Sequence, residues 1–241
     1  MRLSLVIPAY NEAERVGPTL SAVFAHLNRQ DYASEVLVVD DGSRDGTAGV
    51  VEGMRPEAGG VGLKLLRFAK NQGKGAAVRA GMLDAAGEYR FFYDADASTP
   101  IEELDQCWPV FEAGADVVIG SRALAESRIE LRQAWYREHM GRMFNLFLRT
   151  AGLTRFRDTQ CGFKGFTAAA ALCCFSRQTI DRFSFDAEIL FIAARHGLEV
   201  REVPVRWINS PSSKVNPLTD SLRMFAEMLR IRARGAAGRY D

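Results

Sequence analysis

The chain has 241 residues, 47% of them hydrophobic and 25% charged, which is ordinary globular composition and enough for one sizeable α/β domain. The net charge of +1 conceals an asymmetry, because residues 1–120 carry 11 Lys and Arg against 18 Asp and Glu, whereas residues 121–241 carry 20 against 12. The longest uncharged run in the middle of the chain, 165–176, is too short for a membrane span, and the four cysteines lack the spacing of a structural zinc site.

Short apolar segments alternate with helical segments through the first half of the chain. The predicted strands are 3–8, 35–40, 63–68, 89–93 and 116–120, and the predicted helices are 13–28, 46–54, 74–86 and 101–113. This alternation predicts βαβ units and a mostly parallel sheet. Polar clusters follow the first four strands, at 8–12, 40–43, 71–75 and 94–98. Because ligands of such sheets bind beyond the carboxyl ends of the strands, we expect the site at this edge.

Two aspartates, Asp94 and Asp96, directly follow the predicted strand 89–93. Side chains at i and i+2 of an extended chain point to the same side, so the two carboxylates repel each other unless a cation or a donor-rich ligand lies between them. Hard oxygen ligands of this kind suit Mg²⁺ or Mn²⁺, and these ions in turn suit a diphosphate. The alternative interpretation is an acidic turn with solvated carboxylates. The polar clusters after the neighbouring strands favour the metal site.

The second half changes in style. Residues 128–150 and 218–234 both read as amphipathic helices in which aromatic and aliphatic residues alternate with arginines. Helices of this composition can lie in a membrane interface, and the alternative is a core-packed helix with a solvated basic face. The tail from Gly235 is expected to fray. No internal repeat or linker is visible, so we predict a single domain over 1–241, with halves at 1–120 and 121–241.

As a set, the motifs resemble those of the family-2 glycosyltransferases of the GT-A fold. The matching segments of the first half are 6–12, 38–43, 45–47, 71–75, Asp-Ala-Asp at 94–96 and Gly-Ser-Arg at 120–122. Those of the second half are 158–164, 185–188, and 203–207 leading to 213–214. The latter resemble the dolichyl and polyprenyl-phosphate sugar synthases, in particular the dolichyl-phosphate β-glucosyltransferase branch. The resemblance covers residues 3–232.

The resemblance implies a Rossmann-like sheet flanked by helices and a set of site residues. Asp96, Asp158 and Arg122 are the implied catalytic residues, and Asp94 and Asp96 the implied ligands of Mg²⁺ or Mn²⁺. The implied substrate-binding residues are Pro8, Ala9, Tyr10, Glu12, Val39, Asp41, Gln72, Lys74, Asp94, Ala95, Gln160, Arg206 and Lys214. Among these, Asp41 would accept a hydrogen bond from the nucleotide base, and Arg206 and Lys214 would meet phosphate groups.

The implied reaction is inverting transfer of a hexose, glucose from UDP-glucose, to a polyprenyl or dolichyl phosphate. The mannose branch typically has Gln two residues after its Asp-x-Asp, where this chain has Ser98, and this favours glucose over a GDP-mannose donor. A lipid phosphate is already an anion at pH 7 and needs no general base, whereas a hydroxyl acceptor does. Asp158 is therefore interpreted as a positioning residue, as the base if the acceptor is a hydroxyl, or as a turn cap.

Two alternatives stay open on sequence alone: a soluble family-2 glycosyltransferase acting on a small hydroxyl acceptor, and a GDP-mannose-dependent polyprenyl-phosphate mannosyltransferase. A nucleotide-binding protein without activity is disfavoured, because it would have no need for the clustered carboxylates. No secretory leader is recognisable, because 3–8 is too short, so a cytoplasmic protein with reduced thiols is expected. The basic half predicts peripheral binding to the cytosolic face of a membrane, through the faces that carry Trp135, Phe144, Phe147, Phe225 and Met228. A homo-oligomer is possible, and no nucleic-acid partner is expected.

Overall fold

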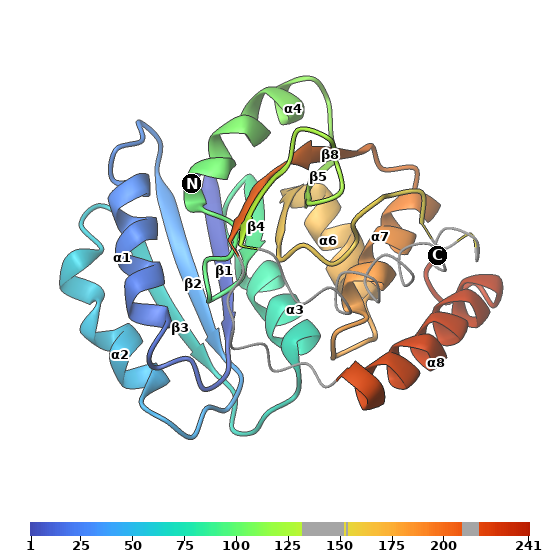
Figure 1. Cartoon of the computed structure of the whole chain (residues 1–241), viewed down its shortest axis with the longest axis horizontal. Helices are drawn as coiled ribbons and strands as arrows, with labels where there is room; N and C mark the ends of the chain where they lie inside the picture. Colours follow the sequence, from blue (N-terminus) through green and yellow to red (C-terminus); the bar gives the residue numbers. More distant parts are fainter. Residues whose placement is uncertain (132–151, 153, 209–216) are drawn as a thin grey trace.

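The computed structural model describes residues 1–131, 152, 154–208 and 217–241, with the side chains of 131 and 217–225 excepted. Its centre is a seven-stranded sheet in the order β3-β2-β1-β4-β7-β5-β8 (Figure 1). The strands of this sheet are β1 Leu3–Ala9, β2 Ser34–Asp40, β3 Gly62–Arg67, β4 Tyr89–Tyr93, β5 Val117–Ser121, β7 Phe163–Thr167 and β8 Val200–Pro204. A separate parallel pair joins β6 Arg128–Leu131 to β9 Arg206–Ile208.

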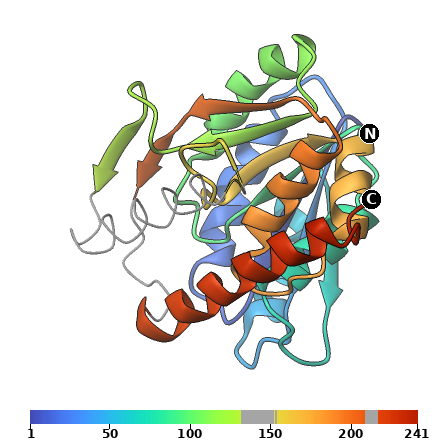
Figure 2. The ribbon, with the colours of Figure 1, turned by 90° about the vertical axis from the view of Figure 1, so that its right-hand side faces the viewer.

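Helices cover both faces of the sheet, because its buried strands present apolar side chains to both sides. Leu5 and Ile7 of β1 belong to one core cluster and Val6 to the other, as the period of two requires. The first cluster is covered by α1 Val16–Leu27, α2 Thr47–Gly53, the 3₁₀ helix η2 Ile101–Cys107 and α4 Trp108–Glu112. The second is covered by α3 Lys74–Asp84, α6 Ala168–Arg177, α7 Phe185–Arg195 and α8 Pro217–Ala236 (Figures 1 and 2).

One strand runs against the others. β7 lies between β4 and β5 and is antiparallel to both, with Lys164 opposite Phe92 on one side and opposite Ile119 on the other. The chain therefore returns from the second half into the middle of the sheet built by the first. This insertion places the start of β7 beside the end of β4, where Asp94 follows.

The helices and strands predicted for the first half are confirmed, and their observed ends differ from the predicted ones by three residues at most. The exception is the predicted helix 101–113, which divides into η2 and α4. The predicted helix over 128–150 is wrong at its start, because residues 128–131 form β6 and pair with β9. Its remainder, with Trp135, Phe144 and Phe147, lies outside the described residues. The predicted helix over 218–234 is confirmed as α8.

The C-terminal tail is fixed rather than frayed. Tyr240 is fully buried, its hydroxyl donates to Glu188 Oε1 at 2.7 Å, and its carbonyl oxygen lies 2.7 Å from His196 Nε2. A buried aromatic ring whose hydroxyl is hydrogen-bonded anchors the chain end. The polar residues around Tyr240 gave no sign of this burial in the sequence. The prediction that Met228 faces a membrane is also wrong, because Met228 is 1% exposed and packs in the core.

Candidate active site

The four polar clusters predicted beyond the strands lie at one edge of the sheet. β1, β2, β3 and β4 are mutually parallel, and each cluster lies at or shortly beyond the carboxyl end of its strand. Backbone strain is present in two of these loops, because Asn11 and Ala97 adopt φ values of 53° and 50°. Asn tolerates this left-handed region, whereas Ala is an outlier there. Ala97 immediately follows Asp96, so the strain lies beside the predicted metal ligand, where strain is typical of functional sites.

Asp41 organises the loop that follows β3. Its carboxylate accepts hydrogen bonds from Gln72 N at 2.7 Å, Gly73 N at 2.8 Å and Asn71 Nδ2 at 2.8 Å, and the residue is 2% exposed. Burial raises the pKa of the Asp41 carboxyl, while the two backbone N–H groups act in the opposite direction. Gly73 has φ of 115°, and a Cβ there would meet Asp181 O at 2.3 Å, so only glycine fits before α3. The expected hydrogen bond from Asp41 to a nucleotide base stays a prediction.

Lys74, the first residue of α3, reaches across to Asp94. Its Nζ lies 2.6 Å from Asp94 Oδ1, and the two side chains are 24% and 33% exposed. Burial alone would lower the pKa of Lys74, but the negative charges of Asp94, Asp186 and Asp96 raise it to about 12. Lys74 therefore stays protonated at neutral pH and provides a fixed positive charge beside the two aspartates.

Asp94 also contacts the second half of the chain. Its backbone N donates to Gly162 O at 3.1 Å. A Cβ at Gly162 would lie 1.9 Å from Asp94 Oδ2, so a side chain at this position would displace the Asp94 carboxylate. The Asp94 carboxylate thus lies between the ammonium of Lys74 and the backbone of the turn before β7.

Asp96 has the environment of a cation ligand. Its Oδ1 accepts from Ser98 N at 3.1 Å, and burial together with the charge of Asp94 raises the pKa of its carboxyl. A divalent cation would relieve the repulsion between the carboxylates of Asp94 and Asp96. Among the described residues, no three His, Cys, Asp or Glu side chains converge on one point. An Mg²⁺ or Mn²⁺ ion that bridges phosphates needs only one or two carboxylates, so Asp94 and Asp96 fit such an ion.

Arg122 and Asp158 form a bidentate pair at the ends of β5 and of the segment before β7. Arg122 Nε and Nη2 donate to Asp158 Oδ2 and Oδ1 at 2.6 and 2.9 Å, and Arg122 N donates to Oδ2 at 3.0 Å. Gln160 N donates to Oδ1 at 3.1 Å. The guanidinium carbon also lies 5.4 Å from the ring centroid of Trp207 on β9. Arg122 is therefore held on two sides.

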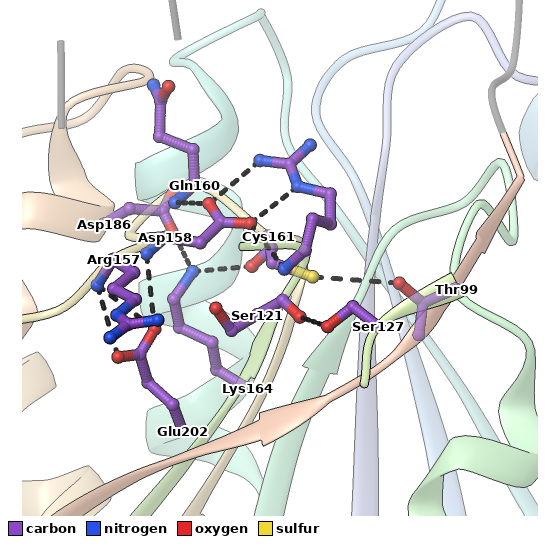
Figure 3. Close-up of polar contacts among 11 residues, drawn as sticks. Thr99, Ser121, Ser127, Arg157, Asp158, Gln160, Cys161, Lys164, Asp186 and Glu202 are labelled. Atoms are coloured by element: carbon purple, nitrogen blue, oxygen red, sulfur yellow. Dashed lines mark hydrogen bonds and ion pairs between the residues drawn. The ribbon is translucent and has the colours of Figure 1, made fainter. Parts of the chain in front are cut away.

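Asp158 is a poor proton acceptor in this setting. The residue is 3% exposed; burial would raise its pKa, but Arg122 and the backbone donors lower it to about 2. The backbone N–H groups of Arg157 and Asp158 point at the carboxylate of Glu202 at 3.2 to 3.3 Å, which fixes this segment further (Figure 3). A general base works best with a pKa near the operating pH. Of the three interpretations of Asp158, the positioning role fits this geometry best.

The other predicted residues divide between exposed and buried settings. Glu12 is paired with Arg15 at 2.6 Å, and Tyr10, Pro8 and Gln72 are at least partly exposed at the same edge. Three of the predicted binding residues are buried in the core clusters, namely Ala9, Val39 and Ala95. The Gln160 side chain points away from the Asp158 carboxylate (Figure 3). All of these binding roles stay predictions.

Arg206 lies on β9, beside this edge. Its guanidinium is 3.9 Å from Glu102 Oε2 and 3.7 Å from Glu130 Oε1, with the side chain 42% exposed. β9 is tied to the loop that carries Asp94 and Asp96, because Ile208 N donates to Ser98 O at 2.8 Å. Lys214, the other predicted phosphate-binding residue, lies outside the described residues.

Sequence reasoning did not assign site roles to Gly162, Lys164, Asp186 or Trp207. Lys164 is fully buried, and its Nζ donates to Cys161 O at 2.6 Å and to Asp186 Oδ1 at 2.5 Å (Figure 3). All four residues fall in the segments that carry the family resemblance. The lysine within Phe-Lys-Gly-Phe was the available signal, since a charge in an apolar strand needs a partner.

Comparison with known proteins identifies the family of this chain. The family model described as Glycosyl transferase family 2 matches residues 4–177. The chain belongs to this family. It is a glycosyltransferase. The dolichyl-phosphate beta-glucosyltransferase ALG5C of Trichomonas vaginalis is 36% identical over 95% of this chain and 70% of its own length. The dolichyl-phosphate beta-glucosyltransferase of Homo sapiens is 32% identical over 99% of this chain and 77% of its own length.

Solved structures share the GT-A fold of this family-2 chain at low sequence identity. The glucosyl-3-phosphoglycerate synthase of Mycobacterium tuberculosis, in complex with Mn²⁺ and UDP-glucose, superposes with a TM-score of 0.69 and 16% identity, over 95% of this chain and 78% of its own. TarS of S. aureus superposes with a TM-score of 0.60 and 19% identity, over 96% of this chain and 71% of its own. The predicted fold class is therefore confirmed.

Proposed function

We propose that this glycosyltransferase moves glucose from UDP-glucose to a dolichyl or polyprenyl phosphate with inversion at the anomeric carbon. In one displacement, an acceptor phosphate oxygen forms the new bond to C1 as the bond from C1 to the diphosphate breaks. The names of the curated relatives support the β-glucosyl product and the lipid phosphate. The observation that carries the proposal is the pairing of Asp158 with Arg122, which leaves the site with a fixed cation and without a free base at that position.

The donor side rests on Lys74, Asp94 and Asp96. These carboxylates would hold Mg²⁺ or Mn²⁺ against the diphosphate, and a divalent ion there neutralises the charge that develops on the leaving group. Lys74 is protonated and adjacent, so its ammonium orients Asp94. The Mn²⁺ and UDP-glucose of the Mycobacterium tuberculosis neighbour are consistent with this donor.

The acceptor side rests on Arg122. Two of its guanidinium nitrogens are occupied by Asp158, while Nη1 donates to none of the described residues. A guanidinium fixed in this way is suited to an anionic phosphate, since its orientation no longer costs side-chain entropy. A phosphate acceptor arrives deprotonated, so positioning and charge neutralisation are sufficient for the displacement.

The acceptor also requires access to a lipid surface. Among the described helices, none is long and apolar enough to cross a membrane. On α8, the side chains of Leu229 and Arg230 are exposed, and so is Arg239 in the tail beyond it, while Met228 and Ile231 face the core. We propose peripheral binding to the cytosolic face of an anionic membrane through this basic surface. Each such charge contributes on the order of 1 kcal/mol near the bilayer.

A donor screen tests the proposal. The protein is incubated with a short polyprenyl phosphate, Mn²⁺ and either UDP-glucose, UDP-galactose or GDP-mannose, and released nucleotide is measured. Release from UDP-glucose that depends on the lipid phosphate is expected, together with tighter calorimetric binding of UDP than of GDP. A clear preference for GDP and GDP-mannose would overturn the donor assignment.

A further inference from the structure

Lys164 is a fully buried cation in the middle of the sheet. It stands on β7 between Phe92 of β4 and Ile119 of β5, and its Nζ lies 5.0 Å from the centroid of the Phe92 ring. Its two hydrogen-bond acceptors are Cys161 O at 2.6 Å and Asp186 Oδ1 at 2.5 Å. Asp186, in the first turn of α7, is itself 6% exposed.

Stability alone does not account for this pair. Charges in an apolar interior lose hydration, and well-packed apolar residues of similar volume are often at least as stable as a buried ion pair. The Lys164 ammonium lies over the ring of Phe92, which belongs to the same core cluster as Phe166 and Phe185. A buried pair in this position therefore calls for a second role.

The first link from Lys164 to the active site runs through the turn before β7. The ammonium fixes the carbonyl of Cys161, and the next residue, Gly162, accepts the hydrogen bond from Asp94 N at 3.1 Å. Gly162 also lies against the Asp94 carboxylate, so a shift of this turn would move Asp94 directly.

The second link runs through Asp186. Its Oδ1 accepts from the Lys164 ammonium at 2.5 Å and so keeps the ammonium directed at the Cys161 carbonyl. Removal of either charge would leave the other buried without its partner and would release this turn.

We infer that Lys164 and Asp186 are positioning residues that hold Asp94 in place from beneath the site, through the 161–162 turn. This inference rests on the proposed function only for its consequence, which is weaker binding of UDP with Mn²⁺ and slower transfer. The positioning itself is a property of the fold and can be measured without any substrate.

Three variants and one control test it. Lys164→Met removes the cation, Asp186→Asn removes the anion while keeping its shape, and Lys164→Met with Asp186→Leu replaces both by apolar side chains so that no buried charge is left alone. Tyr240→Phe is the control, because it deletes a buried hydrogen bond to Glu188 on the same helix α7. Folding of each is checked by denaturant unfolding.

The direct readout is amide hydrogen exchange at Asp94, whose N–H is bonded to Gly162 O. Exchange is expected to become at least about tenfold faster in the double variant and in Asp186→Asn, and to stay unchanged in Tyr240→Phe. Calorimetric Kd for UDP with Mn²⁺ should weaken about tenfold, and kcat should fall about 100-fold, since misplacement by about 1 Å can cost that much.

Unchanged Asp94 exchange in a folded double variant, or wild-type kcat in it, would overturn the inference and make the pair purely structural. If Lys164→Met alone does not fold, the double variant and Asp186→Asn still decide. If the wild type fails to bind UDP with Mn²⁺, the proposed function fails, while Asp94 exchange still reports on the positioning.

Discussion

The two halves of the chain contribute to the site in different ways. In the first, each polar cluster follows its own strand, so the loops after β1 to β4 converge because parallel strands end at one edge. In the second, β7 is antiparallel to its neighbours β4 and β5, so the residues before β7 reach the same edge of the sheet from the opposite chain direction. A local pattern thus fixes the proposed donor side, whereas a non-local strand pairing fixes the proposed acceptor side.

The halves meet at Asp94. Its carboxylate pairs with Lys74 from the first half, and its backbone N–H pairs with Gly162 from the second. The following predictions disturb one side of this junction at a time, beginning with the largest effect.

Asp96→Asn removes a donor-side carboxylate and should lower kcat by at least about 10³-fold, because the charge on the leaving diphosphate loses its counterion site. The fold should persist, since Asp96 lies in an edge loop outside the core. Steady-state rates with added Mn²⁺ and thermal unfolding measure both. Rates like those of the wild type after EDTA treatment and metal return would remove Asp96 from the metal site.

Gly162→Ala disturbs the acceptor side of the junction. The new Cβ would meet the Asp94 carboxylate at 1.9 Å, so we expect about 100-fold slower transfer and about 1–3 kcal/mol lower stability. Gly49→Ala within α2 is the matched control. Nothing lies within 4 Å of its Cβ, and alanine favours a helix by up to about 1 kcal/mol. Equal activities of the two variants would contradict the close contact.

Asp158→Asn removes the anion that holds Arg122. The pKa of Asp158 is about 2 in the fold, below its ordinary value of 3.8, so its ionisation stabilises the fold above pH 4 by about 2 kcal/mol, and this is lost as the pH falls towards 2. Urea unfolding of wild type and variant should differ constantly from pH 5 to 7 and converge below pH 4. If the difference in unfolding free energy between wild type and variant instead grew as the pH fell, the pKa of Asp158 would not be lowered in the fold.

The exposed arginines near the C-terminus, Arg230 and Arg239, test whether the basic second half binds a membrane. Arg230→Gln with Arg239→Gln should weaken binding to anionic vesicles about tenfold or more at low salt. Arg29→Gln, an exposed change in the acidic half, is the control and should have little effect. Flotation at low and high salt measures both. A wild-type protein that stays in solution at low salt would exclude this surface as a membrane contact.

Much of the fold was predictable because its signals are local. The strand and helix periods of the first half, and the carboxylates after the fourth strand, read directly from the sequence. β7 was not predicted as a reversed strand, since Phe-Lys-Gly-Phe carries no sign of its direction. The pairing of Arg122 with Asp158 was also hidden, because 36 residues separate them. The burial of Tyr240 was not predicted for the same reason, since its partner Glu188 is 52 residues away.

The choice of acceptor tests the central claim most directly, namely that Asp158 holds Arg122 for an anion and does not take a proton. UDP-glucose and Mn²⁺ are incubated with a polyprenyl phosphate or with the matching polyprenol, and the glucosylated lipid is identified by mass spectrometry. A product from the phosphate alone, with a rate that shows no ionisation of Asp158 above pH 5, is the expected result. Equal glucosylation of the polyprenol, with loss of that product in Asp158→Asn, would contradict it.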